Sequence, residues 1–394
     1  MITTLAHPSV ATLHQLKTQP IRITLVDDPE ALWRRKAEWN ALAARSETNT
    51  IFQTFEWHAS WWKVFGGDAQ PLLLLAESGR QLVGIAPLMV SEPRLLGRKR
   101  RVVEFIGVGS SDYCDFITDP TRCEVLPLML NWLLENGHQW DVLQLSDVPN
   151  TSSTLSTLAG FFNEHRRPLD MRLLYEAPTR LFGDPEQDQQ LVRKKSLRRH
   201  YNYFQRSGQL EFKHCDTVEE IMGYLDLFFE QHIQRWALTD APSLFLDERQ
   251  RDFYREVVCA LAPTGWLLFS VVLFNQTPLA FHFGFEYGDR IMWYKPTFNV
   301  DYADHSPGEV LIKYLLEYAL DQGVAEFDFT IGEEAFKYRF ANHTRLNYAV
   351  RVFRQLSLFH AHRVWLDAKA WVKQSPTLAR LGRSALRRWQ ELRW

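Results

Sequence analysis

The segment HSPGEV, residues 305–310, joins a strand-like run, RIMWYKPTF (290–298), to a helix-like run, LIKYLLEYALDQG (311–323). Ser306 is a good helix N-cap, Pro307 suits the first helical position, and Glu309 completes an S-x-x-E capping box. Capping does not explain Gly308, because glycine destabilises a helix interior by about 1 kcal/mol relative to alanine. The segment therefore predicts a firm helix start with one unexplained residue.

A first turn without a side chain lets a ligand approach the backbone N–H groups, and helix N-termini attract phosphate. The Glu309 carboxylate would repel a phosphate unless its side chain folds back onto the cap. Helix stability alone and an anion site both remain consistent with this spacing.

The pattern around this segment predicts an α/β unit that begins near Arg193 and ends near Phe353. Periodicity of 3.6 predicts helices, and alternating or continuous apolar runs predict strands. The expected order is helix 196–208, strand 210–215, helices 218–236 and 248–262, strands 266–274, 278–288 and 290–298, the helix after HSPGEV, strand 326–331, short helix 333–340 and strand 346–353.

A second unit of the same kind is expected between Ile21 and Tyr175. Its expected elements are helices 31–45 and 55–65, a hairpin of 71–78 and 82–90, strand 102–108, helix 125–137 and strand 141–148. The predicted fold is therefore α/β, with two lobes in tandem that face each other across a cleft, at residues 20–180 and 181–355. Each lobe is a mixed, mostly antiparallel sheet flanked by helices, and residues 356–394 form a basic helical tail.

Composition excludes several classes of protein. With 46% hydrophobic residues and 14 Trp among 394 residues, the chain can bury a large core. A net charge of -2 gives no reason to expect a nucleic-acid partner. The four cysteines are scattered, without a Cys-x-x-Cys pair, so no metal is expected. The N-terminus shows no export signal, and we expect a cytoplasmic protein.

Six motifs resemble the GNAT acyltransferase superfamily, and more closely its CelD-type branch, which is associated with bacterial polysaccharide biosynthesis and related in fold to FemAB-type transferases. They are FQTFEWHASWW (52–62), GIAPL (84–88), IGVGSSDYCDF (106–116), KKSLRRHYNYFQRSG (194–208), SPGEVLIKY (306–314) and FDFTIGEEAFKYRF (327–340). The glycine loop of better-known acetyltransferases is absent, with SPGEV in its place. The resemblance implies acyl-CoA as co-substrate, bound at Ser306, Pro307, Gly308, Glu309 and Lys337.

Catalytic candidates lie on the polar faces of two predicted strands. Alternation in PLAFHFGFEYG places His282, Gly284 and Glu286 on one face. A lone strand histidine is more often a core residue, but Gly284 leaves space beside His282. Asp328 in EFDFTIG is a second candidate base, whose structural alternative is to pair with Lys337 or Lys295 or to cap the next helix. The resemblance adds Tyr338 as the group that protonates the leaving thiolate.

Substrate contacts are expected from two further segments and two side chains. The resemblance implies that IGVGSSDY forms a turn that presents Asp112 and Tyr113 to the cleft. The segment 193–206 holds six basic residues and no acidic one, and Arg198 is its representative. It is either a solvated helix face or a cleft mouth that attracts anions. Glu286 and Lys295 complete the expected substrate set.

Between Leu356 and Trp394, Lys and Arg outnumber Asp and Glu eight to two. On a helix, Leu381, Ala385, Trp389 and Leu392 would form an apolar stripe flanked by arginines. The stripe either braces the second lobe or contacts an anionic inner-membrane surface or a partner protein.

Three functions follow as hypotheses. The first is transfer of an acyl group from acyl-CoA to an amine or hydroxyl, on a small-molecule or glycan acceptor linked to cell-surface polysaccharide biosynthesis. The second is an aminoacyl-tRNA-dependent ligase of the FemAB type, and it requires the basic segment to bind RNA. The third is a non-catalytic partner of a polysaccharide-synthesis complex, and it requires a cleft filled by side chains.

Overall fold

The fold is that of a computed structural model, which describes residues 19–26, 34–95, 97–137, 140–239 and 241–374. Within these residues one 13-stranded sheet runs through the whole molecule, in the order β1-β2-β3-β6-β8-β15-β9-β14-β13-β12-β11-β10, with β7 paired to β3. The strands are β1 (Ile21–Val26), β2 (Gln70–Ser78), β3 (Gln81–Ser91), β6 (Val102–Phe105), β7 (Ile117–Thr118), β8 (Val142–Pro149), β9 (Leu169–Leu181), β10 (Leu210–Cys215), β11 (Leu267–Phe274), β12 (Thr277–Glu286), β13 (Arg290–Phe298), β14 (Glu326–Asp328) and β15 (His343–Phe353). A separate small hairpin is formed by β4 (Arg94–Leu95) and β5 (Arg98–Lys99).

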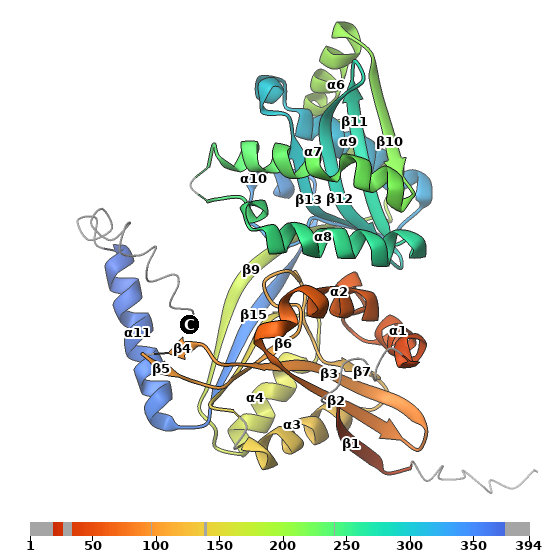
Figure 1. The fold of residues 1–394 in the computed structure, drawn as a ribbon. Coiled ribbons are helices and arrows are strands. Elements are labelled where there is room, and N and C mark those ends of the chain that lie inside the picture. The colour runs from red at the N-terminus through yellow and green to blue at the C-terminus, as the bar shows by residue number, and fades with distance from the viewer. Residues whose placement is uncertain (1–18, 27–33, 96, 138–139, 240, 375–394) are drawn as a thin grey trace, which may run out of the picture.

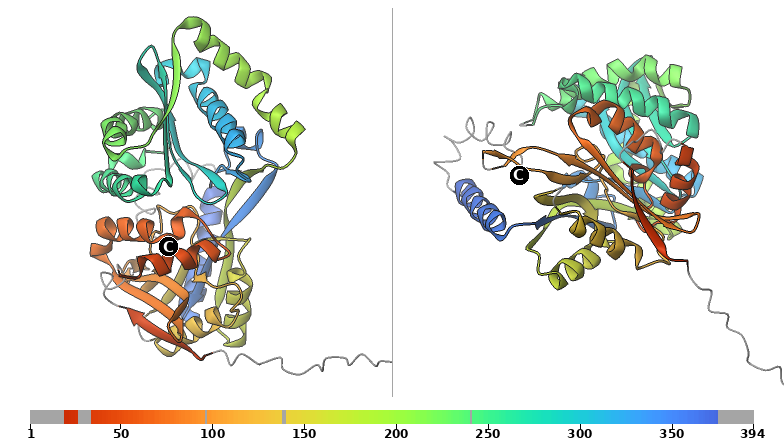
Figure 2. Two further views of the ribbon diagram at one scale, coloured as in Figure 1. Left: turned by 90° about the vertical axis from the view of Figure 1, so that its right-hand side faces the viewer. Right: turned by 60° about the horizontal axis from the view of Figure 1, so that its bottom comes forward.

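Helices cover both faces of each half of this sheet. They are α1 (Lys36–Arg45), α2 (Phe55–Phe65), α3 (Val125–Glu135), α4 (Thr154–Glu164), α5 (Pro185–Val192), α6 (Lys195–Ser207), α7 (Val218–Trp236), α8 (Glu248–Leu261), α9 (Pro307–Gln322), α10 (Ala335–Tyr338) and α11 (Leu356–Gln374). In the C-terminal half, α7 and α8 lie on one face of the sheet and α6 and α9 on the other (Figures 1 and 2). The predicted mixed α/β fold, mostly antiparallel and followed by a helix, is confirmed.

Two long strands, β9 and β15, connect the halves (Figure 1). They pair antiparallel from His343 opposite Thr179 to Val352 opposite Leu169. β15 also pairs with β8, which belongs to the N-terminal half, and β9 also pairs with β14 of the C-terminal half. The expectation that strand 346–353 closes the second lobe was therefore wrong, because its hydrogen-bonding partners are β8 and β9.

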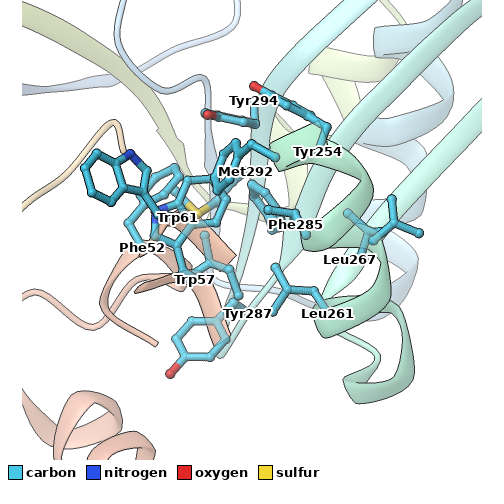
Figure 3. Packing of buried hydrophobic residues seen from close by; sticks show 14 of the residues in the cluster. Phe52, Trp57, Trp61, Tyr254, Leu261, Leu267, Phe285, Tyr287, Met292 and Tyr294 are labelled. Atoms are coloured by element: carbon cyan, nitrogen blue, oxygen red, sulfur yellow. The ribbon is translucent and has the colours of Figure 1, made fainter. Parts of the chain in front are cut away.

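The interface between the halves is an aromatic core. Figure 3 shows Phe52, Trp57 and Trp61 of the N-terminal half together with Phe285, Met292 and Tyr294 of the C-terminal half. The Trp57 ring centroid lies 5.1 Å from that of Phe253 and 5.7 Å from that of Phe285, both in edge-on contacts. Buried residues from both halves form one continuous cluster. The middle of the expected cleft is thus filled by side chains.

Most strongly periodic segments form the elements that were predicted. The helix predicted at 55–65 is α2 with the same bounds, and its N-cap is Thr54, whose hydroxyl accepts a hydrogen bond from the backbone N–H of Trp57. Seven α-helices and strands of the described residues were not predicted: β1, α4, β9, α5 and the two-residue strands β4, β5 and β7. β9 escaped detection because its burial follows no regular alternation from Leu169 to Leu181, and both Arg and Glu lie within it.

No helix of the described residues is long and apolar enough to cross a membrane.

Candidate functional site

The polar centre of the molecule lies where β13 and β14 separate. These parallel strands pair only over Arg290–Met292 and Glu326–Asp328, while β13 continues to Phe298. After Asp328 the chain turns away at Thr330, a β-branched residue with a φ of 56°. Its hydroxyl donates to the carbonyl of Trp293 at 3.1 Å and holds the strands at the start of their separation. A positive φ at a β-branched residue is costly and clusters at functional sites.

Two lysines and one aspartate meet at this separation. Lys337 is buried, and its ammonium donates to the carbonyl of Ile331 at 2.8 Å and pairs with Glu334 at 2.9 Å. Burial lowers the pKa of Lys295, Asp112 raises it, and Lys337 lowers it further. Burial raises the pKa of Asp112, while Lys295 and a hydrogen bond from Thr330 oppose that rise. These side chains therefore lie within electrostatic reach of one another in a site of low polarity.

A tight loop before β7 positions Asp112. Gly107 has a φ of 100°, and a Cβ there would lie 2.5 Å from the Ser111 hydroxyl, so only glycine fits. The indole of Trp57 donates to that hydroxyl at 2.8 Å, and the side-chain amide of Asn347 donates to the Asp112 carbonyl at 2.6 Å. Long-range contacts thus fix the backbone on both sides of Asp112.

Asp328 is held in a buried network next to these groups. Its carboxylate accepts hydrogen bonds from the Tyr113 hydroxyl at 3.0 and 2.9 Å, and from the backbone N–H of Thr330 at 2.7 Å. Burial and the neighbouring Glu326 raise the pKa of Asp328 to about 6, while Arg345 opposes the rise. A cavity of about 130 Å³ borders Tyr113 and Asp328. The Arg345 guanidinium also donates to the Asp328 carboxylate, at 3.4 Å. Because Tyr113, Thr330 and Arg345 occupy it, Asp328 is poorly placed to accept a further proton.

His282 lies on the other face of the sheet, and the expectation that it shares a cleft with Asp328 was wrong. Its ring stacks on Trp293, with centroids 5.3 Å apart, among the side chains that pack under α9. Asp328 lies opposite Met292 in the parallel pair of β13 and β14, so its side chain is on the face of the sheet that packs against the aromatic core. A Cβ on Gly284 would lie 2.1 Å from the His282 ring, so the glycine makes room for the imidazole and not for a ligand. Burial lowers the pKa of His282 to about 3.

The start of α9 differs in part from the predicted cap. α9 begins at Pro307 as expected, but Ser306 has a φ of 52° and makes no side-chain capping bond. The Glu309 carboxylate pairs with Arg339 at 2.6 Å and does not fold back onto the cap. The capping box is therefore absent. The ring of Tyr203 on α6 stacks on His305, 3.6 Å between centroids, and brings basic α6 to this helix end.

The remaining predicted residues lie apart from the two lysines. Tyr338 is 40% exposed, and its hydroxyl donates to Glu176 at 2.6 Å, while its neighbour Lys337 points inward. Glu286 accepts a hydrogen bond from Tyr318 at 2.7 Å. Arg198 is exposed on α6. The structure brings together Asp112, Tyr113, Asp328, Lys295 and Lys337, and leaves these three outside.

A cavity of about 1020 Å³ lies beside the aromatic core. Its wall includes Trp61 and Phe65 of α2, Arg249 of α8 and the loop residues Gly109 and Ser110. The backbone carbonyl of Ser110 also accepts a hydrogen bond from the Tyr294 hydroxyl, so the cavity wall contacts the residue next to Lys295. No group of three or more His, Cys, Asp or Glu within the described residues is arranged to hold a metal.

Sequence reasoning missed Asp147 and Asn347, which border Asp112. Asp147 lies on β8, in line with the apolar Leu143 and Leu145, and an acidic residue at an apolar position of a strand was the available signal. Asn347 gave no such signal, because its contact with Asp112 joins segments far apart in the sequence.

Comparisons with known proteins agree with this geometry. Residues 192–338 match the model of the acetyltransferase (GNAT) domain. No curated protein matches the chain. The structure of FemX is similar to 79% of this chain, over 95% of its own length, with a TM-score of 0.55 and 11% identity.

Two further solved structures show the same fold. A conserved protein of unknown function from Bacteroides thetaiotaomicron VPI-5482 matches 84% of this chain over 100% of its own, with a TM-score of 0.54 and 16% identity. The C-terminal domain of a putative lysylphosphatidylglycerol synthetase from Agrobacterium fabrum matches 85% of this chain over 95% of its own, with a TM-score of 0.53 and 14% identity. The chain therefore has the fold of these proteins, and residues 192–338 in its C-terminal half are similar to the acetyltransferase (GNAT) domain.

Proposed function

We propose that this protein transfers an acyl group from acyl-CoA to an amine or hydroxyl acceptor. The observation that carries the proposal is the pair Lys295 and Lys337, held with Asp112 where β13 and β14 separate in a GNAT domain. Acyl transfer develops negative charge on the carbonyl oxygen, and donors fixed in a site of low polarity stabilise that charge.

Each residue has a distinct part in this proposal. Lys295 and Lys337 supply ammonium N–H donors for the carbonyl oxygen of the acyl group. Asp112 favours the charged form of Lys295, because its carboxylate opposes the lowering of the Lys295 pKa by burial. Thr330 fixes the separation of the strands through its bond to Trp293. An acyl-CoA would supply the thioester, and the backbone N–H of Gly308 at the start of α9 would bind a phosphate group beside α6.

Replacing either lysine by methionine tests the proposal. Lys295→Met or Lys337→Met should lower the rate of CoA release from acetyl-CoA by about 100- to 1000-fold, the usual loss for one donor to an oxyanion. Lys63→Met is the matched control, because Lys63 is 64% exposed and pairs with Glu256 on the surface. Equal rates of CoA release in all three variants would show that neither Lys295 nor Lys337 stabilises the transition state. A thermal-shift screen with acetyl-CoA, longer acyl-CoAs and free CoA identifies the donor.

The acceptor is proposed to be a glycan or small molecule of cell-surface polysaccharide biosynthesis, in line with the CelD-type motifs. The cavity beside Ser110 offers aromatic and charged side chains for it. The non-catalytic alternative required a cleft filled by side chains, and the aromatic core does fill its middle. Binding of acyl-CoA without any turnover would favour that alternative.

A second candidate is an aminoacyl-tRNA-dependent ligase, and one observation favours it. The six basic residues at 193–206 are all exposed, and no ion pair to any of them is found within the described residues. Such a face suits a phosphate backbone. Adding tRNA to the thermal-shift screen decides between the donors: stabilisation by tRNA and not by acyl-CoA selects the ligase.

Contact with a membrane or a partner protein through the tail also stays a proposal. The predicted stripe at 381–392 lies outside the described residues. Deleting residues 377–394 should leave the melting temperature unchanged and abolish binding to anionic liposomes at low salt if the tail is an anchor. A brace on the second lobe predicts a lower melting temperature instead.

A further inference from the structure

Asp147 is a buried carboxyl group without a hydrogen-bond donor. Its side chain is 8% exposed, its Oδ1 has no partner, and no hydrogen bond or ion pair to its carboxyl group is found within the described residues. Other buried carboxylates are matched: Asp115 by Thr48 and Thr154, and Asp188 by Arg180. An unpaired buried carboxyl group is destabilising, and each such group in a folded protein requires an explanation.

The backbone at Asp147 is also held in an uncommon conformation. Its φ is 61°, a left-handed value that costs free energy for a residue with a side chain. β8 bulges here, because Ser146 and Asp147 lie opposite the single residue Ala349 of β15. Bulges of this kind often occur next to active sites, where they redirect a side chain.

Asp147 lies against the candidate centre. Its carbonyl accepts a hydrogen bond from the backbone N–H of Cys114 at 2.9 Å, two residues after Asp112. The two carboxyl groups are close enough that the charge of Asp112 raises the pKa of Asp147. Asp112 Oδ2 and Asn347 Oδ1 are likewise buried without a donor. Three neighbouring acceptors therefore lack donors on the side of Asp112 that borders β8 and β15.

The two bases predicted from the sequence, His282 and Asp328, are poorly placed to take a proton from an acceptor. His282 lies on the opposite face of the sheet, and the Asp328 carboxylate is occupied by Tyr113 and Thr330. Tyr175 of β9 lies opposite Asn347 of β15 in the sheet and is 43% exposed, and partial burial and the charges of Asp147 and Asp112 raise its pKa. Tyr175 is therefore a solvent-exposed neighbour of the two carboxyl groups. An acceptor that passes Tyr175 would meet Asp147 and Asp112 together.

We propose that Asp147 is the general base that takes the proton from the nucleophile of the acceptor, with Asp112 beside it. This inference rests on the proposed acyl transfer. Asp147 accepts the proton of the attacking N–H or O–H as the new bond to the acyl carbon forms. The C–S bond of the thioester breaks, sulfur leaves with the electron pair, and the released thiolate takes a proton from solvent. Asp147 then returns its own proton to solvent.

The test compares Asp147→Asn with Asp115→Asn, a buried aspartate that has its donors. For CoA release from acetyl-CoA, with ethanolamine, glucosamine and glycerol as probe nucleophiles, Asp147→Asn should lower the rate at least about 100-fold. Its melting temperature should stay equal or rise, because asparagine accepts the positive φ and no charge is buried. Asp115→Asn should lower the melting temperature. Asp147→Glu should recover part of the rate.

The pH dependence gives an independent readout. Burial and Asp112 raise the pKa of Asp147 to about 8, so the wild-type rate should rise with pH up to that value. The titratable groups that face Asp147 are Asp112 and Cys114 on the loop and Tyr175 on β9. Infrared titration of the full chain should show one carboxyl band that disappears near pH 8, is absent from Asp147→Asn and shifts to lower pH in Asp112→Asn.

Two results would overturn the proposal. One is an unchanged rate of CoA release in Asp147→Asn. The other is an infrared titration of Asp147→Asn that is the same as that of wild type. If wild type binds neither acetyl-CoA nor a longer acyl-CoA and no probe nucleophile gives turnover, the proposed function fails. The infrared titration still decides in that case whether Asp147 is a titrating carboxyl group.

Discussion

At the residue scale, the centre of the molecule combines burial with unpaired polar atoms. Asp112, Asp147 and Asn347 are each at least nine-tenths buried, and each has a side-chain oxygen without a donor. Such groups lower stability, and a folded protein retains them where function requires them. Trp57, Asn347 and Thr330 hold the surrounding backbone so that these oxygens keep their places.

The pH dependence of stability should report Asp147. Its folded-state pKa of about 8 lies above the unfolded value of about 3.9, so the folded state retains a proton that the unfolded state has lost. Below about pH 4 the ionisation of this carboxyl group therefore does not affect the free energy of unfolding. As the pH rises from about 4 to about 8, it lowers that free energy progressively. The melting temperature of Asp147→Asn minus that of wild type should grow across this window and then level off. A difference that stays constant from pH 4 to pH 8 would contradict the burial of an unpaired acid.

At the element scale, α9 shows how a sequence signal can predict the start of a helix without its cap. Pro307 is the first helical residue, as predicted. The Glu309 side chain forms an ion pair with Arg339, at the end of α10, and makes no capping hydrogen bond. This pairing removes the carboxylate that would fold over the first turn, and part of its charge is neutralised by the guanidinium. The open first turn at Gly308 therefore remains available for the proposed phosphate contact.

Substitution of Gly308 separates helix stability from ligand binding. Gly308→Glu should abolish CoA binding in calorimetry while the protein stays folded, because it adds bulk and negative charge at the proposed phosphate site. Gly308→Ala is the control: its Cβ would lie 3.5 Å from the Phe298 ring, an ordinary contact, and should raise stability by up to about 1 kcal/mol. Wild-type CoA affinity in Gly308→Glu would place the phosphates elsewhere.

At the scale of the whole molecule, one sheet and one aromatic core join the two halves. β15 connects to β8 on one side and to β9 on the other, and the core cluster takes side chains from α2 and β13 alike. The candidate centre depends on this union, since Asp112 comes from the N-terminal half and Lys295 and Lys337 from the C-terminal half.

Truncation of Trp57 tests whether the two halves unfold as one cooperative unit. Trp57 is fully buried between the halves, so Trp57→Ala should cost about 3 to 5 kcal/mol of unfolding free energy. Both halves should lose stability together in one chemical-denaturation transition, followed by tryptophan fluorescence and circular dichroism. Trp57→Phe keeps most of the ring and loses the bond to Ser111, and should cost less. Unfolding of one half at an unchanged denaturant midpoint would show that the halves are independent.

Local sequence patterns predicted most of the individual helices and strands and part of the candidate centre. Periodicity is a property of neighbouring residues, so it sufficed for α2, for the β2 and β3 hairpin and for the start of α9. The motifs also pointed to Asp112, Tyr113, Asp328 and Lys337, and the strand-like run 290–298 contributed Lys295; the fold brings these five residues together. These residues could be predicted from the sequence because each lies in a short segment with a recognisable pattern.

Which face of each strand meets the other half depends on how the whole chain packs. Alternation separates His282 from Phe283 in any strand, but it does not say which of the two faces the partner half. The pairing of β15 with β8 joins residues about two hundred positions apart, and no local preference encodes it. Asp147 emerged in the same way, because its role depends on the bulge opposite β15 and on a loop from another part of the chain. Strand partners and buried polar neighbours are set by the packing of the whole chain, so a local pattern cannot specify them.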